Sequence, residues 1–268
     1  AHDDPNQPPI PSLFSSLLKA HGLTVSRYTW DSLMNRPHVK GLDPLMDCIG
    51  SFDHKDCAAQ GYTYIPLYSE QVPERTLSAA ERSHDFYFCG TMHSNRPRLI
   101  TGVLDACSRR GWTSLMKLFY HSRKLYVLRY IADAVALGLC EQISEVGFPH
   151  AETLQDCAET RVVIDIHHPQ QSGLTMRTFE ALAHGAVLLT TNRAAQHLLD
   201  ESLHARVAFL DLERIEDSME KALAAQSGPL SAAQRHVLSV DRFLDQIFAL
   251  VGIPPPPRHE MYPTLLGV

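Results

Sequence analysis

Two short apolar runs, separated by one segment of helix length, constrain the fold of this chain most strongly. The runs are residues 161–166 (RVVIDI) and 186–191 (AVLLTT), and their composition is that of strands buried on both faces, as in parallel sheets. The segment between them, 175–184, has the length of a helix. A strand, a helix and a second strand in this order predict a βαβ unit, and therefore a parallel sheet covered by helices on both faces.

The same alternation along the chain predicts two α/β domains. Further strands are expected at 25–30, 47–52, 62–67, 85–89, 114–119 and 206–210, and a helix over 122–137. The stretch 72–83 contains a proline and no apolar period, which is typical of a linker. We therefore predict an amino-terminal Rossmann-like domain over 1–75, a second over 84–252, and a proline-rich carboxyl tail over 253–268 with a polyproline segment.

Composition narrows the class of protein. The 268 residues are 44% hydrophobic and 20% charged, which excludes a disordered chain, a collagen-like fibre and a coiled coil. The 24 basic and 30 acidic side chains leave a net charge of −6, so we expect no nucleic-acid partner, and an anionic ligand has to meet a local basic patch. No apolar run approaches the roughly 18 to 20 residues of a membrane span, and residues 1–4 lack the form of a signal peptide, so we predict a cytoplasmic protein.

Cysteine and histidine spacing predicts no metal centre. The six cysteines are scattered, with no Cys-x-x-Cys, and are expected to be free buried thiols in a reducing compartment. The fifteen histidines form no pair with metal-ligand spacing on a single helix.

A candidate anion site follows the strand 161–166. The chain turns through Gly173, and a helix begins whose free amides, at about 175–178, point to the carboxyl end of that strand. Such a helix start binds phosphate oxygens, and Arg177 adds a full positive charge. Glu180, one turn further, is placed to accept hydrogen bonds from ribose hydroxyls. The alternative is a plain turn with Arg177 and Glu180 as surface charges, and spacing alone favours the anion site only slightly.

The same segment resembles a known family. The sequence Ser-Gly-Leu-Thr-Met-Arg-Thr-Phe-Glu-Ala-Leu-Ala-His-Gly (172–185), between its two strands, is similar to the nucleotide-sugar-binding core of GT-B glycosyltransferases, specifically the bacterial surface-polysaccharide and spore-maturation-like members. Blocks at 28–32, 51–56, 64–68 and 85–96 resemble blocks of lipopolysaccharide and capsule biosynthesis glycosyltransferases. The resemblance implies two Rossmann-like domains with parallel sheets, and a metal-independent transfer that needs no cofactor beyond the nucleotide-sugar donor.

The resemblance also implies which residues bind the donor. They are Gly90, Thr91, His93, Arg96, Gly173, Leu174, Thr175, Met176, Arg177, Thr178 and Glu180. Ser94 lies beside them, and a helix N-cap explains it equally well. The chain departs from the family at two places. Ser172 stands where the family has the first of two glutamates, and the amino-terminal domain lacks its expected first strand and glycine-rich turn, so either the chain is truncated or the acceptor half is reduced.

The general base has four candidates. Asp31 and Asp53 each end a strand of the amino-terminal domain, and an inverting transfer requires a carboxylate or a histidine to take the proton of the acceptor hydroxyl. Asp31 is the first choice, although a helix N-cap explains either aspartate equally well. His167 and His168 at the end of the strand 161–166 are further candidates, and a buried, hydrogen-bonded histidine explains His167 equally well.

These patterns favour a glycosyltransferase that moves a sugar from a nucleotide donor to a growing bacterial surface polysaccharide or lipopolysaccharide, with a glycan or lipid-linked acceptor. The rivals are a nucleotide-sugar epimerase of related fold and a degenerate, non-catalytic binding module. Residues 96–129 hold eight basic side chains against one acid, a charge of 8 − 1 = +7. Part of this segment is expected to meet a diphosphate or, peripherally, the anionic inner membrane, and solvated helix faces explain at least half of it.

Overall fold

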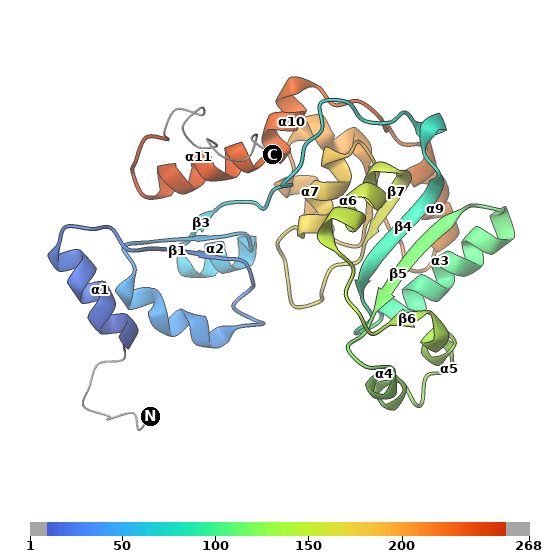
Figure 1. The fold of residues 1–268 in the computed structure, drawn as a ribbon, viewed down its shortest axis with the longest axis horizontal. Helices are drawn as coiled ribbons and strands as arrows, with labels where there is room; N and C mark the ends of the chain where they lie inside the picture. Colours follow the sequence, from blue (N-terminus) through green and yellow to red (C-terminus); the bar gives the residue numbers. More distant parts are fainter. Residues whose placement is uncertain (1–9, 256–268) are drawn as a thin grey trace. The chain divides into compact units, whose positions relative to one another are not determined.

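The computed structural model describes residues 10–255, which form two compact units, each built on a parallel sheet (Figure 1). Unit 1 contains the described residues up to Leu67, the loop Pro169–Gly173 and the residues from Val240 onward. Unit 2 contains Tyr68–His168 and Leu174–Ser239. The α/β fold with two parallel sheets flanked by helices, predicted above, is confirmed.

Unit 2 carries the larger sheet. Over the described residues its strands are β4 (His84–Thr91), β5 (Ser114–Phe119), β6 (Ile143–Ser144), β7 (Thr160–Asp165), β8 (Val187–Thr190) and β9 (Val207–Phe209). All are parallel, in the order β6-β5-β4-β7-β8-β9. The strand order reverses between β4 and β7, and in such sheets the ligand crevice lies at the carboxyl ends of the two strands that flank the reversal.

Helices cover both faces of this sheet. They are α3 (Arg96–Arg110), α4 (Arg123–Arg129), α5 (Ala134–Leu137), α6 (His150–Ala158), α7 (Met176–Ala183), α8 (Ala195–Leu198), α9 (Ile215–Ala224) and α10 (Ala232–Leu238). Phe86 of β4 packs in the core with Ile100 of α3 and Met219 of α9. Tyr87, the next residue, is buried on the opposite face, against α7. This alternation is the period of two of a strand that is buried on both sides.

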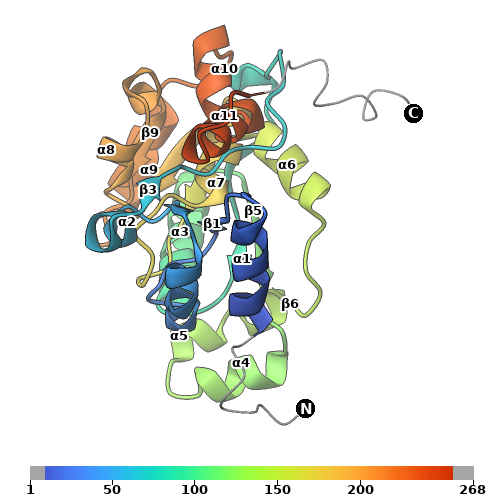
Figure 2. The ribbon, with the colours of Figure 1, turned by 90° about the vertical axis from the view of Figure 1, so that its left-hand side faces the viewer.

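The helix predicted over 122–137 is two short helices, α4 and α5. Asp133 starts α5 as its N-cap and accepts a hydrogen bond from Ala136 N. A capping aspartate has extended backbone, so the helix restarts there. Figure 2 shows both helices at one end of unit 2, beyond β6.

Unit 1 has a smaller sheet of the strands β1 (Ser26–Thr29), β2 (Cys48–Ser51) and β3 (Thr63–Tyr64), all parallel and in that order. Its helices are α1 (Ile10–Ala20), α2 (His54–Gln60) and α11 (Val240–Leu250), with a 3₁₀ helix at Pro37–Leu45. The chain returns to this unit through α11, where Phe243 packs on Tyr28 with the ring centroids 5.1 Å apart.

The division of the chain differs from the contiguous ranges 1–75, 84–252 and 253–268. The change of unit falls after Leu67, and both α11 and the loop Pro169–Gly173 belong to unit 1. The polyproline prediction falls mainly on residues outside those described. Within 10–255, no helix has both the length and the apolar character needed to cross a membrane. All six cysteines are free thiols, as predicted, but Cys48, Cys89 and Cys140 are half-buried rather than buried.

Candidate functional site at the carboxyl ends of β4 and β7

The reversal of strand order in unit 2 brings together two histidines. His93 follows β4 and His168 follows β7, and their ring centroids are 4.8 Å apart. Thr91 ends β4 beside them, and Asp165 ends β7. The predicted donor residues Gly90, Thr91 and His93 therefore lie where ligands bind in sheets of this topology.

Arg96 ties the two strand ends together. Its guanidinium donates to the Ile166 carbonyl of the β7 end, through Nε at 3.0 Å and through a second short hydrogen bond, and to the Thr91 carbonyl at 2.9 Å. Burial lowers the pKa of Arg96, and the Asp165 carboxylate opposes this shift. The side chain was predicted to face the donor phosphates. The structure shows that its hydrogen bonds go to backbone carbonyls, while its charge remains at the site.

His93 is held in its neutral form. Burial, the Arg96 guanidinium and the imidazole of His168 together lower the pKa of His93 to about 4. Its Nδ1 lies 3.1 Å from the Ser94 hydroxyl. A neutral imidazole carries one N–H donor and one acceptor, so near pH 7 His93 is able to donate one hydrogen bond.

The turn before α3 has an unusual backbone. The interpretation of Ser94 as the helix N-cap is wrong, because Asn95 is the N-cap and makes no side-chain capping bond. Ser94 instead has φ +55°, in the left-handed region that a serine rarely adopts. Tyr130 fixes it by donating to the Ser94 carbonyl at 3.2 Å. The amides of the first turn of α3 thus lack the serine cap that was expected.

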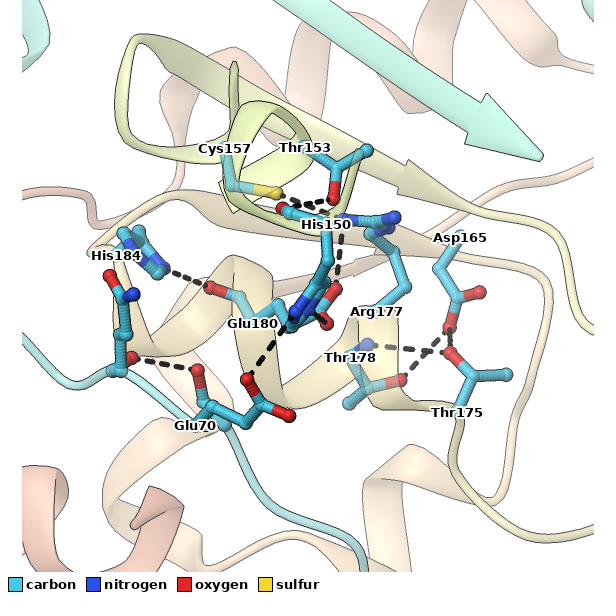
Figure 3. Close-up of polar contacts among 12 residues, drawn as sticks. Glu70, His150, Thr153, Cys157, Asp165, Thr175, Arg177, Thr178, Glu180 and His184 are labelled. Atoms are coloured by element: carbon cyan, nitrogen blue, oxygen red, sulfur yellow. Dashed lines mark hydrogen bonds and ion pairs between the residues drawn. The ribbon is translucent and has the colours of Figure 1, made fainter. Parts of the chain in front are cut away.

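Helix α7 starts from the end of β7 and is fastened there. Thr175 and Thr178 both donate their hydroxyls to Asp165 Oδ2, each at 2.9 Å (Figure 3). Thr175 is also the N-cap and accepts from the Thr178 amide. Leu174 is buried, and Met176 is half-buried. The predicted donor residues of this helix start therefore lie on a turn that Asp165 orients, and an acid within an otherwise apolar strand was the signal for that role.

Arg177 and Glu180 point into the protein rather than to the surface. Their ion pair spans 2.8 Å, and only 17% and 4% of the two side chains are exposed, so the surface-charge alternative is wrong. Glu180 Oε1 lies 2.7 Å from His150 Nε2 (Figure 3). The Arg177 guanidinium lies 5.8 Å from the Tyr87 ring and donates to Cys157 Sγ. No sequence pattern pointed to His150, which reaches α7 from α6.

The environment keeps this buried cation charged. Burial alone would lower the pKa of Arg177, but the neighbouring Cys157 and Glu180 outweigh it and raise that pKa. The half-exposed His150 extends the cluster, with Nδ1 3.4 Å from Glu70 Oε2. Arg177 and Glu180 therefore contact protein groups in this structure, and donor binding by their side chains stays a prediction.

His167 lies after β7 and is hydrogen-bonded. Its Nδ1 lies 2.7 Å from the Thr191 hydroxyl, and that hydroxyl also accepts from the His167 amide. This geometry is the hydrogen-bonded alternative considered for His167, and a catalytic role stays a prediction. Across the described residues, no group of three or more His, Cys, Asp or Glu side chains is placed to hold a metal ion.

Unit 1 contains the two aspartates predicted as bases. Asp53 is 2% exposed and caps α2 by accepting from the amides of Lys55 and Asp56. It also anchors the loop Pro169–Gly173, accepting from Ser172 N at 2.7 Å, from the Ser172 hydroxyl and from Gly173 N at 3.2 Å. Burial would raise the pKa of Asp53, but these bonds, led by Ser172, lower it. Its geometry is that of a structural carboxylate, and catalysis by it stays a prediction.

Gly173 is required by this anchoring. A Cβ at this position would lie 2.4 Å from the Phe52 carbonyl oxygen, closer than real Cβ contacts come. Gly173 was expected to serve the turn before a phosphate-binding helix start, whereas the structure has it in close contact with the backbone of Phe52.

Asp31 is more open and lines a cavity of about 440 Å³ together with Tyr28, Trp30 and Arg36. It accepts from Ser32 N, Asn35 Nδ2 at 2.8 Å and Gln171 Nε2 at 3.1 Å. Burial opposes ionisation, but these hydrogen bonds outweigh it and lower the pKa of Asp31. The carboxylate is ionised and only weakly basic near neutral pH, and its role as base stays a prediction.

Comparison with known sequences finds no relative of this chain, whereas comparison with solved structures does. No family model and no curated protein sequence matches it. Solved structures do match. Alr3699/HepE of Anabaena, in complex with UDP and glucose, has a TM-score of 0.61 at 10% identity, over 90% of this chain and 75% of that one. A glycosyltransferase from Rickettsia africae has a TM-score of 0.56 at 10% identity, over 94% of this chain and 83% of that one.

AviGT4, a glycosyltransferase involved in avilamycin A biosynthesis, has a TM-score of 0.51 at 15% identity, over 76% of this chain. The chain spans 64% of the length of AviGT4. Identities of this size show a shared fold alone. The chain has the GT-B-like fold of two Rossmann-like units.

Proposed function

We propose that this protein is a glycosyltransferase that binds a nucleotide-sugar donor at the carboxyl ends of β4 and β7. It transfers the sugar to a growing bacterial surface polysaccharide or lipopolysaccharide. The observation that carries the proposal is the site at the reversal of strand order, where neutral His93, Thr91 and the charge of Arg96 meet the starts of α3 and α7. A shared fold with a structure that binds UDP and glucose supports it.

The chemistry of the site suits a departing nucleotide. As the bond to the sugar breaks, negative charge builds on the terminal phosphate, and preorganised donors stabilise it most strongly. The free amides of a helix start and a partial positive charge point to this region from both α3 and α7. Arg96 contributes a full charge, and its hydrogen bonds to two carbonyls hold it beside the strand ends. No cofactor beyond the donor and no metal is part of this proposal.

Arg177 and Glu180 contact each other and other protein groups, which suggests a role besides the predicted donor binding. We propose that they position α7, because their charges are matched inside unit 2. In unit 1, Asp31 remains the candidate base, because it lines a cavity of about 440 Å³. The nucleotide-sugar epimerase stays an alternative that the test below separates.

One observation favours the non-catalytic binding module. The two residues at the positions of the family's glutamate pair both contact other protein groups. Ser172 donates a hydrogen bond to Asp53, and Glu180 forms a buried ion pair with Arg177. A chain that had lost transfer while keeping the fold would show this pattern. Such a module would bind a nucleotide or a glycan without turnover.

A thermal-shift panel of UDP, GDP, CMP and dTDP tests the proposal. One nucleotide should raise Tm, because a ligand that binds only the folded state stabilises it by about 2.7 kcal/mol at one hundred times Kd. His93→Ala and Thr91→Ala should lose most of that shift. His197→Ala, an exposed histidine on α8, is the matched control and should keep it.

Product analysis with the matching nucleotide sugar then separates the three functions. A transferase releases nucleotide and builds a new glycosidic bond only when acceptor is present, an epimerase changes the free donor alone, and a binding module does neither. No shift with any nucleotide, or full binding by His93→Ala, would contradict the proposed donor site.

A further inference from the structure

Helix α4, the turn that follows it and helix α5 expose a concentration of large apolar side chains. Within the part of the chain that the structure describes, thirteen such side chains are exposed, and five of them lie within 125–135. Leu128 and Ile131 are the most open of the five, at 66% and 69%, and Leu125 and Val135 are 47% and 46% exposed. Single exposed apolar residues are normal in proteins, but a contiguous group marks an interaction surface.

These exposed side chains are not part of the hydrophobic core. The inward side of the segment is complete, because Tyr126 and Ala136 are fully buried and the Tyr126 hydroxyl donates to the Ala136 carbonyl at 2.8 Å. Leu125 and Leu128 are three residues apart in α4, so they share a face of that helix. The outward side chains therefore stand on a fixed scaffold and have no role in holding it together.

Two cations next to these side chains lack a carboxylate partner. Of the eight basic residues in 96–129, Arg96 is held at the site described above, and five have an ion pair. Those five are Arg98 with Asp133, Arg109 and Arg110 with Glu216, Lys117 with Glu152, and Arg123 with Glu141. Among the described residues, no ion pair involves Lys124 or Arg129. Both lie on α4, each four residues from a leucine of the exposed group.

The nearby acids are already engaged. Asp133 caps α5 and pairs with Arg98, and Glu145 accepts from the Arg123 amide. Glu141 is 93% exposed and lies 3.9 Å from Arg123. The charge left beside the apolar group is therefore positive. Aliphatic side chains flanked by Lys and Arg match an anionic lipid surface, where the apolar groups enter the acyl boundary and the cations meet the headgroups.

We propose that the α4–α5 surface, formed by Leu125, Leu128, Ile131 and Val135 with Lys124 and Arg129, docks on a bilayer that contains anionic lipids. A protein partner fits less well, because the centre of the surface is aliphatic and the anchors of protein interfaces are enriched in Trp, Tyr and Arg. None of these six residues was assigned to the β4–β7 site, although the neighbouring Tyr130 fixes the Ser94 turn there. The proposed docking does not depend on the proposed transfer activity.

Vesicle flotation of the full chain tests this docking. The protein should float with vesicles of phosphatidylcholine and phosphatidylglycerol in about equal amounts, and much less with pure phosphatidylcholine. Added salt should weaken binding, because the electrostatic part is screened. The double variants Leu128→Ser/Ile131→Ser and Lys124→Glu/Arg129→Glu should each reduce bound protein by about tenfold or more.

A matched control carries the same kinds of change elsewhere on unit 2. Leu212→Ser/Lys221→Glu replaces an exposed leucine and an exposed lysine, and it should float like the parent. Unchanged Tm in all variants excludes unfolding as the cause. Equal binding to both vesicle types, binding that survives both α4–α5 variants, or no flotation together with self-association that those variants abolish would each overturn the proposal.

Discussion

Single residues at the β4–β7 site combine predictable and unpredictable features. The position of His93 and Arg96 just after a strand was predictable, because both follow the strand expected at 85–89. The structure extends that strand to Thr91. The direction of each side chain was not predictable. Arg96 turns to the Ile166 carbonyl, 70 residues away in sequence, and hydrophobic patterns carry no information on such a pairing.

Asp53 and Gly173 show the same limit. An aspartate before α2 predicts an N-cap, and the structure has one. The second use of Asp53, as the anchor of residues 119 and 120 positions away, depends on the tertiary fold. An aspartate and a glycine at these positions indicated a cap and a turn. The residues that they contact lie more than one hundred positions away and could not be predicted.

His93 should make stability depend on pH. Its pKa is about 4 in the folded protein and about 6.5 in an unfolded chain. Between these values the unfolded state binds more protons, so the free energy of unfolding falls as pH drops from about 6.5 to 4, and the full contribution is present above 6.5. His93→Gln removes this group, and its urea midpoints, measured at steps between pH 4 and 8, should fall less steeply with pH.

His197→Gln serves as the control for that measurement, since the histidine is exposed. His184 also has a lowered pKa, caused mainly by burial, and its contribution remains in both variants. Parallel pH profiles for the parent and His93→Gln would show that His93 is not held neutral by its surroundings.

At the scale of elements, α7 is the best predicted and the most reinterpreted. Its range, its start after a buried strand and the βαβ order follow from local composition, and the structure confirms them. Its orientation about its own axis is set by contacts with α6 and β4, and these turn Arg177 and Glu180 inward. A helix wheel shows that the two share a face, but not which neighbour that face meets.

The Arg177–Glu180 pair should therefore stabilise the fold. Arg177→Met leaves a buried carboxylate with His150 as its remaining partner, and breaking a buried pair in this way costs about 3 kcal/mol or more. Arg177→Met/Glu180→Gln removes both charges and should recover a large part of the loss. Urea unfolding of the two single variants and the double variant gives the coupling energy.

Arg98→Met is a useful comparison for this cycle, because its ion pair with Asp133 lies at the surface, where the Arg98 side chain is 69% exposed. Such pairs contribute about 0 to 1 kcal/mol. A loss for Arg177→Met no larger than for Arg98→Met, or additive effects in the cycle, would argue that the buried pair does not hold α7.

At the scale of the whole molecule, the fold class was predictable and the route of the chain was not. Strands and helices alternate along the sequence of both units, and this alternation was enough to predict two parallel sheets. The return of α11 to unit 1, and the loop Pro169–Gly173 that belongs to the same unit, leave no mark in composition. The return of α11 follows from contacts such as Phe243 on Tyr28, which lie more than two hundred positions apart. The place of the loop follows from the hydrogen bonds of Ser172 and Gly173 to Asp53, 119 and 120 positions away.

The charge of the whole molecule leads to the last prediction. The chain carries a net charge of −6, so a nucleotide diphosphate has to be held by local positive charge. In unit 2 the charge of Arg177 is matched by Glu180, which leaves Arg96 and the starts of α3 and α7. If these suffice, nucleotide binding needs no divalent metal, and the thermal shift and turnover should be the same in excess EDTA as in Mg²⁺.

Arg96→Gln should weaken nucleotide binding by about tenfold or more in either buffer, which is the contribution of a charge-assisted contact. Arg98→Gln, on the same helix and ion-paired with Asp133, should bind like the parent. Binding or turnover that disappears on chelation and returns with Mg²⁺ or Mn²⁺ would mean that a metal, and not Arg96 with the helix starts, neutralises the diphosphate.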